Sequence, residues 1–197
     1  MIKLGLTGSI GMGKSTTASM FRDADIPVWD ADAAVHELYS AGGAAVGPIQ
    51  SLFSGAIVDN AVSRDALKQI IQSDPNALPA IEKIVHPLVA DHRANFIAAH
   101  ADAELVVFDI PLLFETGADA WLDKVLVVSC PPEVQAERVL SRGTMTPEQF
   151  DMIRSRQMPD AEKRARADYI IETLTLDGTA ADVRHLISDL TNGANHA

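Results

Sequence analysis

The stretch Gly8-Ser9-Ile10-Gly11-Met12-Gly13-Lys14-Ser15 decides the fold of this 197-residue chain. It fits the pattern G-x-x-x-x-G-K-[ST] and lies between an apolar run, 2–7, and a helical pattern, 14–23. Its glycines let the backbone turn with N–H groups facing inward, and the N-terminus of the helix adds roughly half a positive charge. The stretch therefore predicts a phosphate-binding P-loop, which we expect to continue to Thr16.

Two side chains of the loop carry chemistry. Lys14 is expected to reach the β and γ phosphates of a nucleotide, and the Ser15 hydroxyl is expected to bind Mg²⁺. With average residue frequencies the pattern occurs by chance in about one per cent of chains of this length, so a purely structural glycine turn is a weak alternative. The sequence contains no Asn-Lys-x-Asp element, the usual guanine-reading loop, which disfavours a GTPase.

Short apolar runs separated by helical patterns organise the rest of the chain. Besides 2–7, they predict strands at 26–29, 105–108, 125–128 and 169–171. Near-continuous Val, Ile and Leu runs are typical of parallel strands covered on both faces, and ligands then gather at the carboxyl ends of the strands. The predicted fold class is α/β, with a doubly wound parallel sheet of five strands.

Two segments interrupt this pattern. Residues 32–100 contain helical patterns punctuated by prolines and no convincing strand, which predicts an insertion of several short helices. Residues 138–159 include Thr146-Pro147-Glu148, typical of a capped helix start, and are predicted to form a lid. The nucleotide-binding core then comprises 1–31, 101–137 and 160–197, with a frayed tail from residue 191.

Composition limits the classes of function. The chain has 47% hydrophobic residues and a formal net charge of −11, so we expect a substantial core but no nucleic-acid partner, which would require clustered Lys and Arg. No apolar run approaches the roughly 18–20 residues of a membrane span, and the first residues lack the features of a signal peptide. The single cysteine, Cys130, agrees with a reducing compartment. We therefore expect a cytoplasmic protein with no membrane association.

Two carboxylates follow the second predicted strand, in Asp30-Ala31-Asp32. Because they lie at the carboxyl end of a strand, one of them could accept the proton of an attacking hydroxyl group beside the phosphates. The alternative is that Asp30 or Asp32 only caps the helix beginning near Ala33. The sequence alone leaves both interpretations open.

Arginines gather in and around the predicted lid. Arg138 and Arg142 are four residues apart on a helix predicted after the fourth strand, so both guanidinium groups would project from one face and could clamp phosphates. The alternative is pairing with acidic neighbours on a solvated surface. That alternative weighs more heavily for Arg154 and Arg156, farther along the lid.

Two further residues are candidates for substrate or metal binding. His86 stands before Pro87, whose fixed φ suits the first turn of a helix running to about Ala99, and its ring could bind an acceptor substrate or act only as a structural cap. Asp109 ends the third predicted strand, where a carboxylate often contacts Mg²⁺ directly or through water. Capping or a contact with a lysine is the alternative for Asp109.

Together these motifs occur in an order and spacing that resembles the dephospho-CoA kinase family. The matching elements, which extend over nearly the whole chain, are Leu6–Ser15, Asp30–Asp32, His86-Pro87, Asp109–Glu115 and Gln157–Pro159. The P-loop alone is common to many families, but this combination is far more specific. The sequence departs from the family pattern at Ile171-Glu172-Thr173, where the family often has an Asp-Asn or similar pair, and at Gly143-Thr144 in the lid, where it commonly has Asp-Gly or Asp-Asp.

The resemblance implies ATP- and Mg²⁺-dependent phosphorylation of the 3′-hydroxyl of the dephospho-CoA ribose, the last step of coenzyme A synthesis. It implies that Asp32 is the general base, that the helical insertion receives the acceptor, and that the lid folds over the phosphates. Catalysis would also use Lys14, Arg138 and Arg142, and Ser15 and Asp109 would hold the metal. The residues expected to contact the acceptor substrate are Thr7, Asp32, His86, Asp109 and Leu112.

Two rival functions remain open at this stage. One is another small-molecule kinase of the same architecture, which acceptor screening would distinguish. The other is a nucleotide-dependent switch that captures a partner protein and phosphorylates no small molecule. Among oligomeric states, a monomer is expected.

Overall fold

The structure, a computed structural model, describes residues 1–193 and divides the chain into two compact units. The core unit comprises Met1–Trp29 and His100–Ala197, and the insertion unit comprises Asp30–Ala99. The helix at the end of the chain continues to Gly193, so the predicted fraying is wrong for residues 191–193; residues 194–197 lie outside the described part. Within residues 1–193, no helix combines the length and apolar character needed to cross a membrane.

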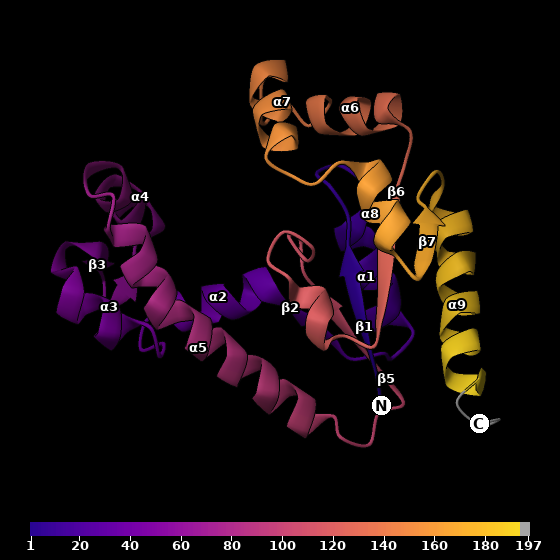
Figure 1. The fold of residues 1–197 in the computed structure, drawn as a ribbon, viewed down its shortest axis with the longest axis horizontal. Coiled ribbons are helices and arrows are strands. Elements are labelled where there is room, and N and C mark those ends of the chain that lie inside the picture. Colours follow the sequence, from indigo (N-terminus) through magenta and orange to yellow (C-terminus); the bar gives the residue numbers. More distant parts are fainter. Residues whose placement is uncertain (194–197) are drawn as a thin grey trace. The chain divides into compact units, whose positions relative to one another are not determined.

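A five-stranded sheet forms the centre of the core unit (Figure 1). Its order is β2-β5-β1-β6-β7, and the register shows that β1 pairs in parallel with β5 and β6, and β6 with β7. All five predicted strands are confirmed, with ends shifted by at most two residues. Their bounds are β1 Ile2–Thr7, β2 Val28–Asp30, β5 Leu105–Asp109, β6 Lys124–Ser129 and β7 Tyr169–Glu172.

The two faces of the sheet have separate apolar layers because side chains alternate along each strand. Leu126 and Val128 of β6 pack into the layer formed with α1 (Lys14–Asp23) and α9 (Leu176–Gly193). Val125 and Val127 pack on the other face, against the segment after β5. The doubly wound α/β prediction is therefore confirmed. The remaining elements of the core unit are the 3₁₀ helix η2 (Ala118–Trp121), α6 (Pro132–Leu140), α7 (Pro147–Ser155) and α8 (Asp160–Arg166).

The insertion unit is mainly helical and has its own apolar core, which includes Leu38, Ile49 and Ile81. It also contains a short antiparallel pair, so the prediction that residues 32–100 hold no strand is wrong. The reason is that each strand has only two residues, too few for a pattern, and that Asp59 and Asn60 make the turn with φ of 50° and 61°. Its elements are α2 (Ala31–Tyr39), α3 (Val46–Leu52), η1 (Ser54–Ala56), β3 (Ile57–Val58), β4 (Ala61–Val62), α4 (Arg64–Ser73) and α5 (Ala77–Ala99).

The longest helix contradicts a prediction based on proline. Pro87 does not begin a helix but lies inside the 23-residue α5, which starts at Ala77 and has Pro79 in its first turn. An interior proline removes one backbone hydrogen bond and costs about 3 kcal/mol or more. Burial of Ile81 and Val85 on one side of α5 offsets that cost, so the helix continues through Pro87. His86 consequently lies in the helix interior and does not cap a helix start.

Candidate active site

The loop after β1 has the backbone shape of a phosphate cradle. Gly11 and Gly13 adopt left-handed φ values of 79° and 87°, which other residues rarely adopt, and Gly13 is the N-cap of α1. At Gly8 there is no room for a side chain, since a Cβ atom would lie 2.8 Å from the carbonyl oxygen of Val128. The loop therefore needs glycine at all three positions, and it directs the N-terminus of α1 toward the site.

Lys14 and Asp109 form an ion pair at the base of the loop. The Lys14 Nζ lies 2.5 Å from the Asp109 Oδ1, and the Asp109 side chain is only 3% exposed. The alternative considered for Asp109, a contact with a lysine, is thus what the structure contains. The carboxylate also stands at the carboxyl end of β5, next to β1 in the sheet, so it borders the phosphate loop. Its use as a metal ligand stays a prediction.

The oxygen donors near the loop suit Mg²⁺. Ser15 is exposed in the first turn of α1. The carboxylate of Asp109 is paired with Lys14, the residue just before Ser15. Within residues 1–193 there is no group of three or more His, Cys, Asp and Glu side chains that could hold a metal ion unaided. Mg²⁺ in phosphoryl-transfer sites is usually held by one or two protein oxygens together with substrate phosphates. Ser15 and Asp109 fit that donor set.

Two of the cavities beside the loop are lined by its glycines. One, of about 340 Å³, is lined by Gly8–Thr16 with Pro111, Arg142, Ile153 and Gln157. The other, of about 410 Å³, lies against Gly11 and Gly13 and is lined further by Thr16, Thr17, Arg138, Ser141, Arg142, Thr173, Leu174, Thr175, Leu176 and Thr179. The first surrounds the predicted phosphate positions, and the second extends from them toward the start of α9. All the P-loop residues predicted to bind nucleotide, Gly8 to Thr16, line the first cavity.

The two predicted clamp arginines do not share a helix. Arg138 lies on α6, but α6 ends at Leu140, so Arg142 stands beyond it and the prediction of one common helix face is wrong. Ser141 caps the helix, and Gly143, with a φ of 64°, turns the chain and donates its N–H to the Leu140 carbonyl. Both arginines nevertheless line the 410 Å³ cavity.

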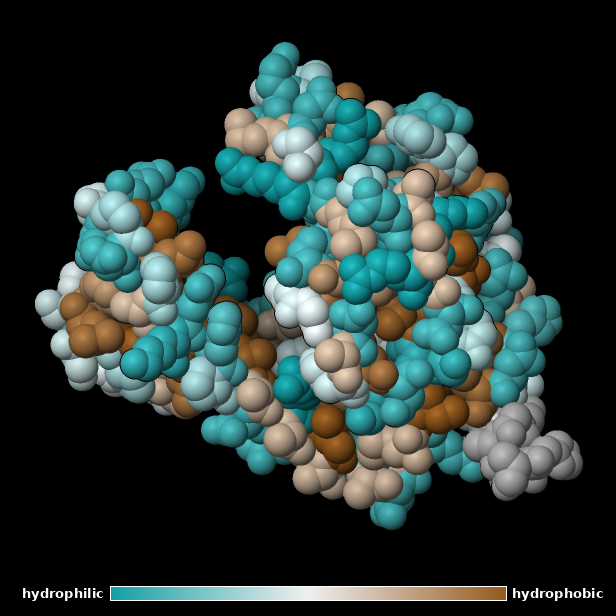
Figure 2. Space-filling model, viewed as in Figure 1, coloured by the Kyte–Doolittle hydropathy of each residue, from teal (hydrophilic) through white to brown (hydrophobic). Residues whose placement is uncertain are grey.

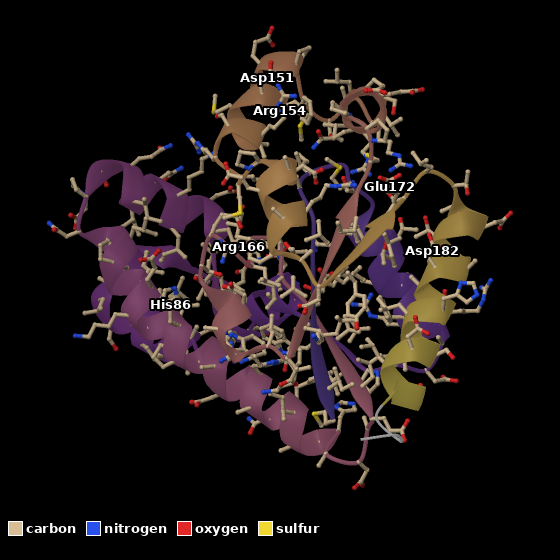
Figure 3. All side chains as sticks on the ribbon, turned by 45° about the vertical axis from the view of Figure 1, so that its right-hand side comes forward. His86, Asp151, Arg154, Arg166, Glu172 and Asp182 are labelled. Atoms are coloured by element: carbon tan, nitrogen blue, oxygen red, sulfur yellow. The ribbon has the colours of Figure 1, made fainter. Side chains whose placement is uncertain are left out.

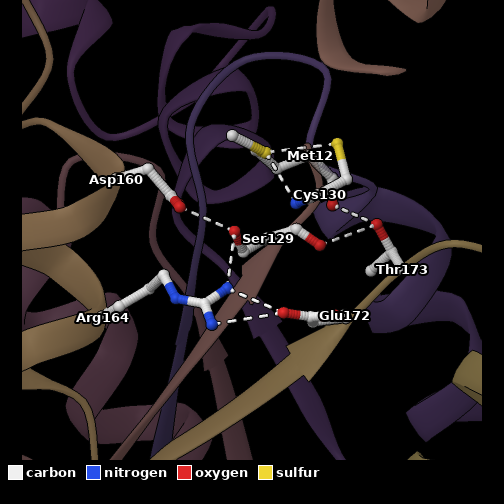
Figure 4. Close-up of polar contacts among 7 residues, drawn as sticks. All are labelled: Met12, Ser129, Cys130, Asp160, Arg164, Glu172 and Thr173. Atoms are coloured by element: carbon white, nitrogen blue, oxygen red, sulfur yellow. Dashed lines mark hydrogen bonds and ion pairs between the residues drawn. The ribbon is translucent and has the colours of Figure 1, made fainter. Parts of the chain in front are cut away.

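Thr173 connects Arg138 to the phosphate loop. The Arg138 Nη1 donates to the Thr173 Oγ1 at 3.0 Å and its Nη2 donates to the Thr173 carbonyl oxygen. The Thr173 hydroxyl in turn donates to the Met12 carbonyl at 2.9 Å (Figure 4). Arg138 is thus held by a residue after β7, not by an acidic surface neighbour. Thr173 therefore supports the phosphate loop directly.

Met12 is held through its side chain as well. Its Sδ accepts a hydrogen bond from the Cys130 N–H at 3.1 Å and lies 3.4 Å from the Cys130 Sγ (Figure 4). Burial raises the pKa of the Cys130 thiol, which keeps it protonated at neutral pH. Cys130 therefore supports the loop as a small buried side chain, and its thiol is a poor nucleophile.

A polar network joins the carboxyl ends of β6 and β7 to α8 (Figure 4). The Ser129 Oγ donates to the Asp160 Oδ2 at 2.7 Å, and the Arg164 Nη1 donates to the Ser129 Oγ at 3.3 Å. Arg164 also pairs with Glu172 at 3.1 Å. The network fixes the two strand ends from which Cys130 and Thr173 reach the phosphate loop.

Glu115 anchors the chain where the predicted lid returns to the core. Its Oε1 accepts the Met158 N–H at 2.8 Å and lies 2.9 Å from the Nζ of Lys163, whose side chain is fully buried. Burial raises the pKa of Glu115, but the hydrogen bonds from Lys163 and Met158 and the positive charge of Lys163 outweigh it and lower this pKa overall. Sequence patterns gave no sign that Lys163 is buried.

The predicted lid contains α7, whose start is confirmed. Thr146 caps it, and Gln149 completes a reciprocal capping box. Arg154 pairs with Asp151 at 2.9 Å, both on α7 (Figure 3), which supports the surface interpretation considered for this arginine. In the view of Figure 2, the residues over α6 and α7 are mostly hydrophilic.

The residues predicted to meet the acceptor lie in both units. In the core unit, Thr7 is fully buried and its Oγ1 donates to the Pro111 carbonyl at 3.0 Å, while Leu112 is 42% exposed. In the insertion unit, Asp30 is the residue that caps α2, since its Oδ1 accepts the Ala33 N–H at 2.9 Å. Asp32 is exposed in the first turn of α2, and its side chain does not cap the helix.

His86, also in the insertion unit, is exposed on α5 (Figure 3). Its interior position in the helix removes the capping alternative. Acceptor binding by His86 stays a prediction.

Comparison with known proteins identifies the family. A family model described as dephospho-CoA kinase matches residues 2–177. The chain belongs to the dephospho-CoA kinase family. A dephospho-CoA kinase from Jannaschia sp. is 62% identical over 190 residues, which cover 96% of this chain and 97% of that protein. The corresponding protein of Ruegeria pomeroyi is 58% identical over 195 residues, covering 99% and 98%.

Two solved structures share the fold. A crystal structure from Thermus thermophilus superposes with a TM-score of 0.83 at 34% identity, covering 96% of this chain and 98% of the other. A dephospho-CoA kinase from Campylobacter jejuni gives a TM-score of 0.72 at 22% identity, with 98% of each chain covered. The second likeness concerns the fold alone, and both agree with the P-loop kinase architecture that the sequence predicts.

Proposed function

We propose that this chain transfers the γ-phosphoryl group of ATP to the 3′-hydroxyl of the ribose of dephospho-CoA, forming CoA and ADP. The observation that carries the proposal is the glycine loop with its ion-paired Lys14, in a chain that matches the dephospho-CoA kinase family over residues 2–177. We also propose that the protein works as a monomer in the cytoplasm. The single, buried Cys130 supports that compartment.

The triphosphate of ATP lies on the Gly8–Ser15 loop in this proposal. Backbone N–H groups of the loop and the N-terminus of α1 bind the phosphates, and Lys14 moves from Asp109 toward the β and γ phosphates. Ser15 and Asp109 would hold Mg²⁺, which when bound would supply positive charge that offsets the negative charge of the phosphates. This arrangement is supported by the exposed Ser15 and by the position of Asp109 beside Lys14.

The adenine ring occupies the 410 Å³ cavity next to the loop. That cavity offers the flat guanidinium group of Arg138, which its contact with Thr173 holds in place, and the exposed apolar side chains of Leu174 and Leu176. Guanidinium planes and apolar side chains both bind the faces of an aromatic base favourably. In this arrangement Arg138 acts mainly through the nucleotide base, and Arg142, which lines both cavities, is the arginine nearer the phosphates.

Asp32 accepts the proton of the attacking 3′-hydroxyl. Its exposed carboxylate follows β2 by two residues, and the cap of α2 is already provided by Asp30. Within the insertion unit, the exposed His86 is the further residue proposed to bind the acceptor. A base that orients the hydroxyl for in-line attack is sufficient here, because phosphoryl transfer depends mainly on positioning and charge stabilisation.

The direct test is product formation. Purified protein is incubated with Mg·ATP and dephospho-CoA, and CoA is sought by mass spectrometry, with adenosine, shikimate and a nucleoside monophosphate as control acceptors. CoA formed from dephospho-CoA and no phosphorylated product from the controls is the expected result. Absence of CoA at any reasonable enzyme concentration would refute the proposal.

A further inference from the structure

Two glutamines hold the backbone of one residue in the phosphate loop. The Gln135 Nε2 donates to the Ile10 carbonyl oxygen at 2.7 Å, and the Gln157 Oε1 accepts the Ile10 N–H at 3.1 Å. The orientation of each side-chain amide follows from its partner, because an N–H needs an acceptor and a carbonyl needs a donor. The peptide groups on both sides of the Ile10 Cα are therefore fixed.

The two glutamines stand at the two ends of the arginine-bearing segment. Gln135 lies on α6, just before Arg138, and Gln157 follows the last arginine, Arg156. Between them lie Arg138, Arg142, Arg154 and Arg156, of which Arg138 and Arg142 line the cavities beside the loop. Both ends of this segment thus converge on a single loop residue.

Each glutamine is itself rigidly placed. Gln135 is 3% exposed, and α6 packs so closely on the loop that a Cβ atom at Gly11 would lie 3.2 Å from the Gln135 carbonyl oxygen. Gln157 is followed by Met158, whose N–H is bound by Glu115, the partner of the buried Lys163. Gln157 also lines the cavity around the loop together with Arg142 and Ile153.

We propose that Gln135 and Gln157 are positioning residues for phosphoryl transfer. By binding the Ile10 backbone from both sides, they fix the position of the segment between them relative to the phosphate loop, so that Arg142 meets the phosphates in a productive geometry. This inference rests on the proposed use of the lid over ATP. Small displacements of positioning groups can cost up to about 10²-fold in rate, so loss of either contact lowers turnover more than it lowers nucleotide affinity.

The test compares Gln135→Met, Gln157→Met and the double variant with the parent protein. Methionine has similar length and no amide. We expect each single variant to lose about 5- to 20-fold in kcat, with the KM for ATP changed less than about 3-fold, and to form less CoA per ATP consumed. The double variant should lose less than the product of the single losses, since both contacts act through Ile10.

Glutamate variants distinguish positioning from bulk structure. Glu at position 157 still offers an oxygen to the Ile10 N–H, so Gln157→Glu should retain more of the parent kcat than Gln157→Met. Glu at position 135 turns an acceptor toward the Ile10 carbonyl, so Gln135→Glu should be no better than Gln135→Met. Gln149→Met is the matched control, because it removes a similar amide contact, to the Thr146 N–H at 2.9 Å, away from the phosphate loop.

The results that would overturn this inference differ from the result that would refute the proposed function. Folded Met variants with the parent kcat and the parent ratio of CoA to ATP consumed would overturn the inference. So would a kcat loss in Gln149→Met as large as in Gln157→Met. If the buried Gln135 variants do not fold, the half-buried Gln157 series alone decides by the same criteria. A parent protein that forms no CoA would instead refute the proposed function, which is a distinguishable failure.

Discussion

The 3′-hydroxyl of a ribose is a weak nucleophile, and its reaction with ATP is aided by a base that takes its proton. Asp32 is the carboxylate proposed for this task, and its exposed position in the first turn of α2 leaves it open to an incoming hydroxyl group. Asp30, two residues earlier, accepts the Ala33 N–H and serves the helix. Only Asp30 thus fits the N-cap geometry, and the carboxylate of Asp32 is not used as a cap.

Replacing Asp32 by asparagine tests this assignment. Asp32→Asn keeps the shape of the side chain but removes its basicity, so turnover should fall at least about 10²-fold while ATP binding stays nearly unchanged. Initial rates of CoA formation and calorimetric titration with a non-hydrolysable ATP analogue measure the two quantities. Asp30→Asn is the control, since asparagine also caps helices well. Near-normal turnover of Asp32→Asn would reject the general-base role.

At the residue scale, sequence predicts what a local motif encodes. The loop from Gly8 to Ser15 could be predicted because its glycines and Lys14 are adjacent in the chain. Thr173, Gln135 and Gln157 could not be predicted as supports of that loop, because their partners lie between 125 and 161 residues away. Only the folded sheet brings such distant residues together. The motif Gln157–Pro159 marks Gln157 in the sequence but does not reveal which backbone it contacts.

At the scale of elements, the junction between the lid and the core depends on one buried ion pair. Glu115 binds the Met158 N–H before α8 and the fully buried Lys163 on α8. Removing one partner of such a pair leaves an uncompensated charge inside the protein. The pair therefore holds α8 against the segment after β5 only while Glu115 is ionised.

Glu115→Gln should lower the free energy of unfolding by about 2–3 kcal/mol at pH 7, because Lys163 remains charged and buried. The pKa of Glu115 in the folded protein lies below its ordinary value of 4.5, so its stabilising contribution is complete above that pH and is lost as the pH falls through the folded-state pKa. Urea unfolding at pH 7, 5 and 3 should show a difference between parent and variant that is constant down to about pH 5 and shrinks below it.

The double variant Glu115→Gln with Lys163→Met provides the control, since it removes both charges together. It should recover part of the stability lost in Glu115→Gln. A stability difference between the parent and Glu115→Gln that grows as the pH falls from 5 to 3 would contradict the assigned role of this ion pair.

Errors in predicting elements have local physical causes. Pro87 suggested a helix start, but the apolar side chains of Ile81 and Val85 keep α5 continuous through it. Arg142 was placed on a helix because spacing alone does not reveal that Ser141 and Gly143 end α6. In contrast, the capping box at the start of α7 was predictable, since its two members, Thr146 and Gln149, are only three residues apart.

At the scale of the whole molecule, a kinase must keep water from taking the place of its acceptor. Water is present at about 55 M in bulk, so an enzyme with a permanently assembled open site would hydrolyse ATP wastefully. A lid that completes the site only when both substrates are bound avoids this. The segment between Gln135 and Gln157, with its arginines, is suited to that task.

We therefore expect ATP hydrolysis without dephospho-CoA to be at least about 10²-fold slower than CoA formation with it. ADP formation in the presence and absence of the acceptor measures the ratio, with Asp32→Asn as a control for contaminating ATPases. Equal rates of ATP consumption with and without dephospho-CoA would show that site assembly does not depend on the acceptor.

The ion pair between Lys14 and Asp109 has a consequence for how tightly nucleotide is held. Before ATP arrives, the lysine already has an anion as its neighbour, so the protein contains its own competitor for the triphosphate. The affinity for ATP then reflects the exchange of the Asp109 carboxylate for the triphosphate as the partner of Lys14. ATP therefore gains less from Lys14 than it would from an unpaired lysine. Such an exchange favours easy release of ADP, because the departing phosphates leave behind a lysine with a carboxylate ready to receive it.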